Sequence, residues 1–302
     1  MTCSWGPWPS PPSYVRERSQ AASTNAFMAA YGSLAADKVF GNVICSSRNS
    51  LGINPQTGEM NMADNVLPRG RNFDHRFFAA AAAVMLFAVL VGFGPTFYLK
   101  PFFNNPPVAR SIIYVHGFVM AAWVALFVVQ VYFVSSKRIK LHQKLGMAGV
   151  ALAVAVFTVG LMVTVAAARY GPASAPANIP PLQFMIVPFG DMLVFVVLFG
   201  AAIYYRKNSP NHKRLMLLTM INFLAPAIAR FPGGLTNDYG PLWFFGVPTV
   251  LTIALIAIDT WRNGKLNKVF LFAGIFMVAA MWIRLPLSST PQWLSFAQWL
   301  VS

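Results

Sequence analysis

From residue 77 the chain alternates between apolar runs of about 20 residues and short polar loops. A helix needs about 20 apolar residues to cross the hydrocarbon core of a bilayer, where only helices and closed barrels satisfy their own backbone groups. The pattern therefore predicts an all-α polytopic membrane protein in which residues 67–302 form a domain of seven transmembrane helices. The runs cover residues 77–98, 111–134, 145–168, 182–205, 213–231, 241–261 and 267–285.

Composition and charge favour the same class of protein. Hydrophobic residues make up 57% of the chain and charged residues only 10%, against about 25% charged residues in soluble domains. The formal net charge of +15 would suit a nucleic-acid-binding protein, but the cations lie in short loops between apolar runs. The positive-inside rule explains that placement, so we expect a lipid bilayer and not nucleic acid as the partner.

The loop charges also predict the orientation. Loops on one side, with the flank before the first run, hold 14 Lys and Arg residues, and the other side holds five. Because cytoplasmic loops are enriched in Lys and Arg, we expect the N-terminus inside and the C-terminus outside a bacterial inner membrane.

The two ends of the chain differ from this pattern. Residues 1–66 are rich in Ser, Asn, Gly and Pro and are expected to be a disordered tail, or to precede a true translation start at Met60 or Met62. Both cysteines, Cys3 and Cys45, lie in that tail. The end, "TPQWLSFAQWLVS", is too short to span and predicts an interfacial helix with its Trp residues at headgroup depth.

Ionisable residues inside spans are costly, so each one is a candidate site residue. His116 and Asp191 lie in the half of their runs nearer the outside, and Arg230 and Arg284 end their runs on that same side. We expect these four residues to meet in an outer-half cavity, with Asp191 as the counter-ion of an arginine or of protonated His116. The cavity would be an ion or substrate site.

A polar stripe marks the second run. His116, Met120, Trp123 and Gln130 recur at helical spacing on one face, which predicts that this face points into the bundle. Two interpretations stay open: a hydrogen-bond network that specifies packing, and a proton, ion or cofactor site that includes His116 and Gln130.

Two similar stretches, "LHQKL" and "NHKRL", begin the third and fifth runs and carry His142 and His212. Their cations suit membrane anchoring at the cytoplasmic surface, whereas the histidines are explained only partly. One interpretation makes both residues helix ends. The other makes His142 and His212, with His116, candidate cofactor ligands, because haem iron takes axial His.

The chain resembles known proteins in several stretches. "GFGPTFYL", "HGFVMAAWVALFVVQ", "LHQKLGMAGVALA", "GDMLVFVVLFGAAIYYRKNSPNHKRLMLL" and "PQWLSFAQWLVS" together resemble a family of uncharacterised bacterial seven-span membrane proteins over residues 68–302. "NHKRLMLL" is also similar to small membrane proteins linked to cytochrome oxidase assembly. That second resemblance implies a role near the respiratory chain.

Soluble-enzyme motifs are absent from the sequence, so we expect no catalytic centre. Two function classes follow from the membrane pattern and the candidate residues. The first class is a haem-associated or respiratory-chain assembly protein that uses the histidines. The second is a small-molecule or proton-coupled transporter or binding protein with a site around Asp191. A non-catalytic membrane scaffold is the third alternative, and a membrane-protein partner or a second copy of the chain is a candidate partner.

Overall fold

The structure is a computed structural model that describes residues 69–103, 110–171 and 179–302. The predicted disordered tail, both cysteines and the alternative starts at Met60 and Met62 lie outside these residues. Residues 70–302 form one compact unit, and every regular element described in it is a helix. The all-α prediction is therefore confirmed for the part of the chain that the structure describes.

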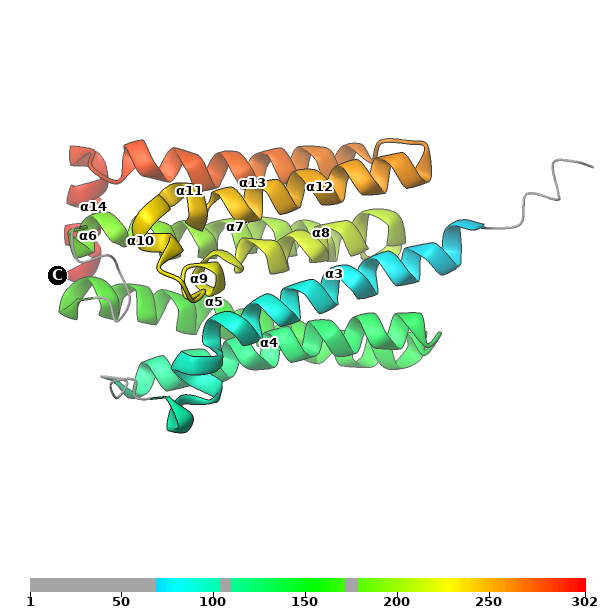
Figure 1. Cartoon of the computed structure of the whole chain (residues 1–302), viewed down its shortest axis with the longest axis horizontal. Coiled ribbons are helices and arrows are strands. Elements are labelled where there is room, and N and C mark those ends of the chain that lie inside the picture. Colours follow the sequence, from blue (N-terminus) through cyan, green and yellow to red (C-terminus); the bar gives the residue numbers. More distant parts are fainter. Residues whose placement is uncertain (1–68, 104–109, 172–178) are drawn as a thin grey trace, which may run out of the picture. The chain divides into compact units, whose positions relative to one another are not determined.

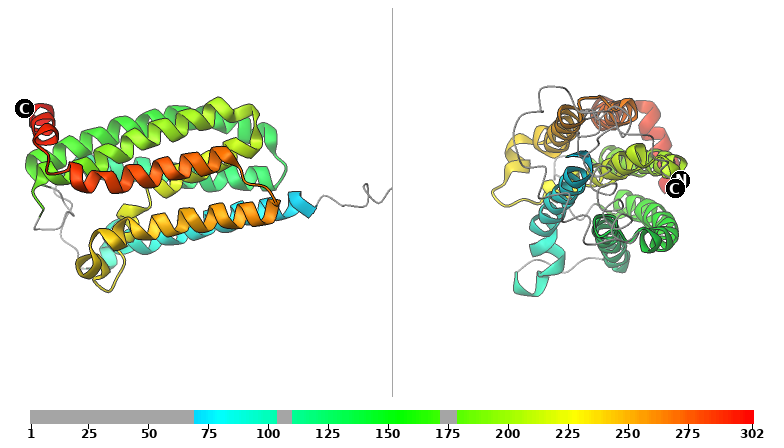
Figure 2. Two further views of the ribbon diagram at one scale, coloured as in Figure 1. Left: turned by 90° about the horizontal axis from the view of Figure 1, so that it is seen from above. Right: turned by 90° about the vertical axis from the view of Figure 1, so that its right-hand side faces the viewer.

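Long helices run lengthwise through this unit (Figure 1). In chain order they are α3 (Arg69–Phe93), α4 (Ser111–Ser135), α5 (Ile139–Tyr170), α7 (Ile186–Tyr204), α8 (Ser209–Asn222), α12 (Gly246–Asn263) and α13 (Lys268–Leu287). Short elements join or extend them: η2 (Gly94–Tyr98), η3 (Lys100–Phe102), α6 (Pro181–Phe184), η4 (Tyr205–Lys207), α9 (Ala225–Ile228), α10 (Leu235–Tyr239) and α11 (Pro241–Phe244). The last helix, α14 (Pro291–Val301), runs across one end of the unit instead of along it (Figure 2).

The two ends of the unit differ in charge. We call the end that carries α14 the α14 end. The opposite end holds the turns after α4, α7 and α12 with their Lys and Arg residues, and we call it the basic end. Because the connections alternate between the two ends, the long helices run alternately up and down.

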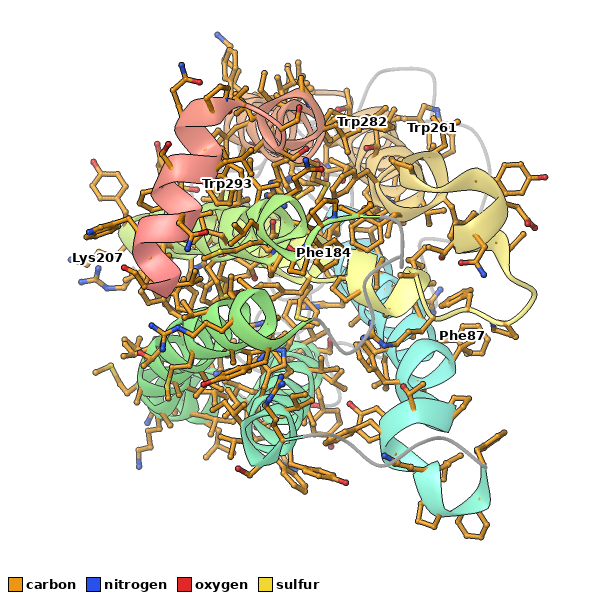
Figure 3. The ribbon with its side chains drawn as sticks, turned by 90° about the vertical axis from the view of Figure 1, so that its left-hand side faces the viewer. Phe87, Phe184, Lys207, Trp261, Trp282 and Trp293 are labelled. Carbon is orange, nitrogen blue, oxygen red and sulfur yellow. The ribbon has the colours of Figure 1, made fainter. Side chains whose placement is uncertain are left out.

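Six helices in the described residues are long and apolar enough to cross a membrane: 74–98, 111–135, 139–170, 181–207, 241–263 and 268–287. Their outward side chains are largely apolar, as contact with lipid requires. Phe87 and Trp261 are 66% and 81% exposed and project from the periphery in Figure 3, whereas Phe184 lies inward. These features make a multi-pass membrane protein the class that the fold supports.

The continuous fifth spanning helix expected at 213–231 is wrong. α8 has 14 residues, a rise of about 21 Å, which is short of the roughly 30 Å core of a bilayer. The helix ends at Asn222 because Pro226 has no N–H to donate to the Asn222 carbonyl, and the chain turns through Phe223 and Leu224 before α9. Residues 217–222 are all buried, so this interrupted segment is the innermost of the unit.

α14 matches the predicted C-terminal helix. Thr290 caps it by accepting a hydrogen bond from the Trp293 N–H at 3.3 Å, and Pro291 occupies its first turn, where no donor is needed. The Trp293 indole N–H donates to the Leu182 carbonyl at 2.9 Å. Arg169 donates to the Val301 carbonyl at 2.7 Å, so α14 is fastened to the ends of both α5 and α6.

Candidate functional site

A cavity of about 280 Å³ lies among the helices in the half nearer the α14 end. Its lining comes from α3, η2, α4, α5, α6, α7, α8 and α9, with one residue of α11. Two irregular backbone segments border it: the π-helical turn η2 contributes Phe97 and Tyr98, and the break after α8 contributes Phe223 and Leu224. Both kinds of irregularity are common at functional sites in membrane and soluble proteins.

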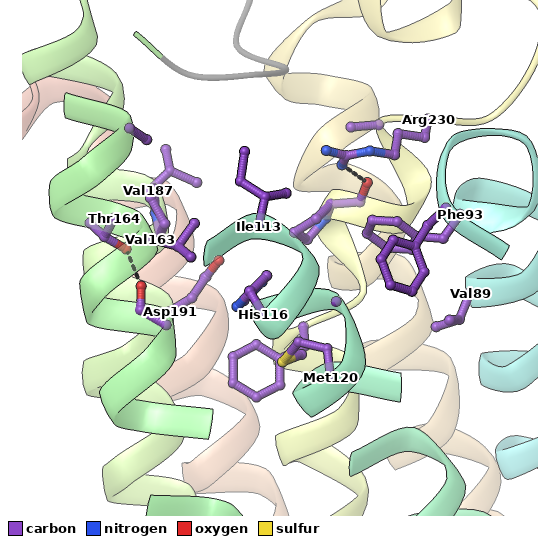
Figure 4. Close-up of a pocket in the computed structure, with 18 of the residues that line it drawn as sticks. Val89, Phe93, Ile113, His116, Met120, Val163, Thr164, Val187, Asp191 and Arg230 are labelled. Atoms are coloured by element: carbon purple, nitrogen blue, oxygen red, sulfur yellow. Dashed lines mark hydrogen bonds between the residues drawn. The ribbon is translucent and has the colours of Figure 1, made fainter. Parts of the chain in front are cut away.

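The three ionisable residues predicted for the outer half, His116, Asp191 and Arg230, all line this one cavity. They come from α4, α7 and the segment after α9, so the packing of distant segments brings them together. Figure 4 shows His116 between Asp191 on one side and Arg230 on the other. Arg284, the fourth residue, contacts Asp191 from α13.

Asp191 is buried, at 4% exposure, and accepts a hydrogen bond from Arg284 Nη1 at 2.5 Å. Arg284 also donates to the Val187 carbonyl at 3.1 Å. A carboxylate removed from water needs such a partner. Arg284 therefore compensates the charge of Asp191, which answers the sequence-based question of which cation serves it.

Arg230 is held by two neighbours on its own side of the cavity. Its Nη1 donates to the Pro226 carbonyl at 2.6 Å, and its guanidinium carbon lies 4.7 Å from the centre of the Phe93 ring. The first contact anchors the side chain to the broken helix, and the second is a cation–π interaction with α3. The positive charge is thereby fixed in the cavity wall.

Some lining residues carry buried polar atoms that have no hydrogen-bond partner among the described residues. These atoms are His116 Nδ1 and Trp123 Nε1. Buried polar groups are normally satisfied, and leaving one unpaired costs roughly 1–3 kcal/mol. Both residues belong to the stripe predicted on the second run, and they make the cavity suited to a polar ligand atom.

Aromatic rings close the cavity towards the basic end. Trp123 packs edge-on against Phe195 with ring centroids 5.2 Å apart, and against Phe199 at 5.7 Å. Phe223, from the break after α8, meets Phe195 at 5.0 Å. This aromatic layer separates the cavity from the polar residues near the basic end.

His142 and His212 lie together at the basic end, with ring centroids 6.3 Å apart and planes at 79°. His212 Nδ1 is 2.8 Å from the Ala202 carbonyl oxygen, so Nδ1–H donates to that carbonyl and Nε2 is the ring nitrogen left for another contact. His142 Nδ1 and Gln130 Oε1 are buried without a hydrogen-bond partner among the described residues. His116 lies on α4 about four helical turns before Gln130, so it does not join the His142–His212 pair.

Ion pairs, one of them buried, also link helices at the basic end. Arg214 on α8 binds Asp259 on α12 through two hydrogen bonds of 2.8 Å, and Asp259 is fully buried. Lys213 contacts Asp74 of α3 at 2.6 Å. The two cations of "NHKRL", Lys213 and Arg214, therefore form salt bridges between helices, in addition to the anchoring role expected from the sequence.

One buried polar residue was missed at the sequence level. Asn222 is fully buried and donates from Nδ2 to the Asp191 carbonyl oxygen at 2.9 Å, joining the broken helix to α7 beside the cavity. The signal was available, since an amide inside the apolar run "LLTMINFLAP" needs a partner. Within the described residues, no group of three or more His, Cys, Asp or Glu side chains is arranged to hold a metal ion.

No protein-family model, curated protein or solved structure matches the chain. The cavity, the His pair and the ion pairs described above are therefore the features that bear on function.

Proposed function

We propose that the protein crosses a bacterial inner membrane seven times, with its basic end in the cytoplasm. Six crossings are the long apolar helices, and the fifth in chain order is the interrupted segment α8–α9. Its burial at the centre of the unit supports this assignment, because irregular backbone is tolerated at membrane depth only where protein or a cavity surrounds it. The basic end then obeys the positive-inside rule.

Within that frame, the protein is a small-molecule binding protein or transporter whose site is the cavity around His116, Asp191 and Arg230. One observation carries this proposal: the broken helix, the π-helical turn and the ionisable residues of the outer half all border the same cavity. Discontinuous helices form the substrate sites of many transporters. A cavity of about 280 Å³ is near the lower limit of ligand pockets, so the ligand is small.

Cysteine accessibility tests this function without a known ligand. Residues 46–302 contain no cysteine, so Cys3→Ser/Cys45→Ser gives a clean background. Val163 lines the cavity, and Val154 on the same helix is 62% exposed and would face lipid. We expect Val163→Cys to react with the neutral, water-soluble hydroxyethyl methanethiosulfonate from the outer side only, and Val154→Cys to stay unreactive.

Both variants should react after denaturation in SDS, which is the control for the thiol itself. If Val163→Cys reacts only after denaturation, ligands cannot reach the cavity and the scaffold alternative gains support. Right-side-out and inverted vesicles separate the two sides of the membrane. Labelling from the cytoplasmic side would contradict the proposed orientation.

A second candidate function is supported by the close approach of His142 and His212. Two imidazoles from different helices, edge to face with ring centroids 6.3 Å apart, are candidate axial ligands of a haem iron, in a haem-associated or respiratory-chain assembly protein. His212 also has the Nδ1–carbonyl contact that commonly orients a metal-binding His. Gln130 contacts α5 near this pair: its amide nitrogen is 3.7 Å from the position that a Cβ on Gly146 would take, and Gly146 follows His142 by one helical turn.

A visible difference spectrum, dithionite-reduced minus oxidised, tests this candidate on protein expressed with a haem precursor. A stoichiometric Soret and α-band signal that is lost in His142→Ala and His212→Ala, and kept in His116→Ala, would establish haem at the pair. A flat spectrum would return both histidines to helix-end roles.

A further inference from the structure

We propose that the ligand of the cavity is a small organic monoanion, such as a carboxylate, attached to an apolar and preferably aromatic body. This inference rests on the proposed binding function and names the ligand class for the same site. The charge balance of the wall, the type of its polar atoms and the nature of its apolar surface each support it.

The charge balance of the lining is positive. Arg110 and Arg230 line the cavity, and Asp191 is the one acid among the described lining residues. Asp191 is already compensated by Arg284, which approaches it from behind. The described lining residues therefore carry a net positive charge. A ligand cation would be repelled, whereas an anion offsets the cost of keeping Arg230 in an apolar surrounding.

Three lining side chains, Arg110, Arg230 and Trp123, carry polar groups that can only donate. A guanidinium has five N–H groups and no acceptor, and the indole of Trp123 can only donate. Trp123 Nε1 and His116 Nδ1 have no hydrogen-bond partner among the described residues. A carboxylate is an acceptor with about four lone-pair sites and binds a guanidinium in two-point geometry. Its oxygens match what these residues offer better than an alcohol, an amine or an ammonium group would.

The rest of the lining is apolar and rich in polarisable groups. Aromatic rings from several elements line it, among them Phe93, Phe97 and Trp123, together with methionines such as Met120 and Met192. Aromatic and sulfur-containing surfaces favour a ring over a plain alkyl chain. The volume of about 280 Å³ leaves space for one ring and a carboxylate but not for a whole phospholipid.

The charge of a thiol reagent gives a direct test in the full-length chain. On the Cys3→Ser/Cys45→Ser background, Val163→Cys is reacted with sulfonatoethyl methanethiosulfonate, an anion, and with trimethylammonioethyl methanethiosulfonate, a cation. The ratio of the two rate constants is divided by the same ratio for free 2-mercaptoethanol. The thiolate fraction of the cysteine is common to both reagents, so it cancels and leaves the electrostatic preference of the cavity.

We expect the normalised ratio to favour the anion by at least about tenfold, equivalent to 1.4 kcal/mol. Arg230→Gln should lower the ratio at least about threefold, and Arg110→Gln provides a second variant if the first does not fold. Arg206→Gln removes one charge at the basic end, where the side chain is exposed, and should leave the ratio unchanged.

The outcomes separate the two proposals. If both reagents react and the normalised ratio is one or below, the anionic ligand is refuted while the accessible small-molecule site stands. If the ratio favours the anion but Arg206→Gln lowers it as much as Arg230→Gln, the preference belongs to the whole membrane surface and the inference is again wrong. If neither reagent reacts except after denaturation, the proposed function itself fails, and the ligand class with it.

Discussion

A single methyl group added at Gly190 should break the ion pair beside the cavity. A Cβ built on Gly190 of α7 would lie 2.4 Å from Arg284 Nε and 2.8 Å from Arg284 Cζ. A Cβ essentially never lies so close to another atom, so Gly190→Ala must displace the Arg284 side chain, and we expect the displacement to separate its guanidinium from Asp191. Gly200, on the same helix, has no atom within 4 Å of its built Cβ and serves as the matched control.

The magnitude follows from two opposing effects. Replacing Gly with Ala inside a helix stabilises it by roughly 0.5–1 kcal/mol, and both substitutions receive this gain. Gly190→Ala also separates a pair whose side chains are only 4% and 6% exposed. Loss of one partner of a buried pair costs about 3–5 kcal/mol. We therefore expect Gly190→Ala to destabilise by about 2–4 kcal/mol, and Gly200→Ala to be neutral or slightly stabilising.

Unfolding in mixed micelles, titrated with SDS and followed by tryptophan fluorescence, measures the difference between the two variants. The destabilisation of about 2–4 kcal/mol assumes that the ion pair is lost. A shift of the long Arg284 side chain that keeps Asp191 as its partner would lower the cost. Equal stability of Gly190→Ala and Gly200→Ala would refute the reasoning. It would mean that Arg284 keeps Asp191 in another rotamer, and that the close approach of α7 to α13 is not needed for the pair.

Two further predictions use the same titration. Gly92→Ala should destabilise by at least about 1–3 kcal/mol, since its Cβ would lie 2.2 Å from the backbone oxygen of Ala227, which cannot rotate away; a result equal to Gly200→Ala would show that α3 moves freely. Asp259→Asn should cost about 3–5 kcal/mol, most of it recovered by adding Arg214→Met, and a cost below 1 kcal/mol would place this pair with ordinary surface salt bridges.

Hydropathy predicted the membrane class and the approximate positions of six helices because lipid imposes a simple rule: a span must be long, apolar and helical. The third helix begins at Ile139, six residues before the expected start at 145. The same rule failed at 213–231, where the run is long enough but the helix is not continuous. Pro226 indicated a kink, but the sequence did not show that the helix after it would stop at Ile228. There Trp243 and Thr236 donate to the carbonyls of Ile228 at 3.0 Å and Ala229 at 2.9 Å, contacts that only the tertiary fold creates.

The position of each residue along its apolar run was enough to predict that His116, Asp191 and Arg230 would border one cavity. It did not give the pairing, because the choice between Arg230 and Arg284 as partner of Asp191 depends on how α13 packs against α7. The similar "LHQKL" and "NHKRL" stretches left open whether His142 and His212 are adjacent, and in the structure the two rings lie side by side. Sequence spacing alone could not show that an aromatic layer separates them from the cavity.

The two ends of the unit carry their positive charges for different physical reasons. At the basic end, Lys and Arg residues that are not paired with Asp74 or Asp259 are mostly exposed, and the membrane surface explains them. Arg230 is partly buried in the wall of an apolar cavity, where a charge is expensive. Its cation–π contact with Phe93 offsets about 0.5–2 kcal/mol of that cost. A bound anion would offset a further part of it, which is why we propose Arg230 as a ligand-binding residue and not as an anchor.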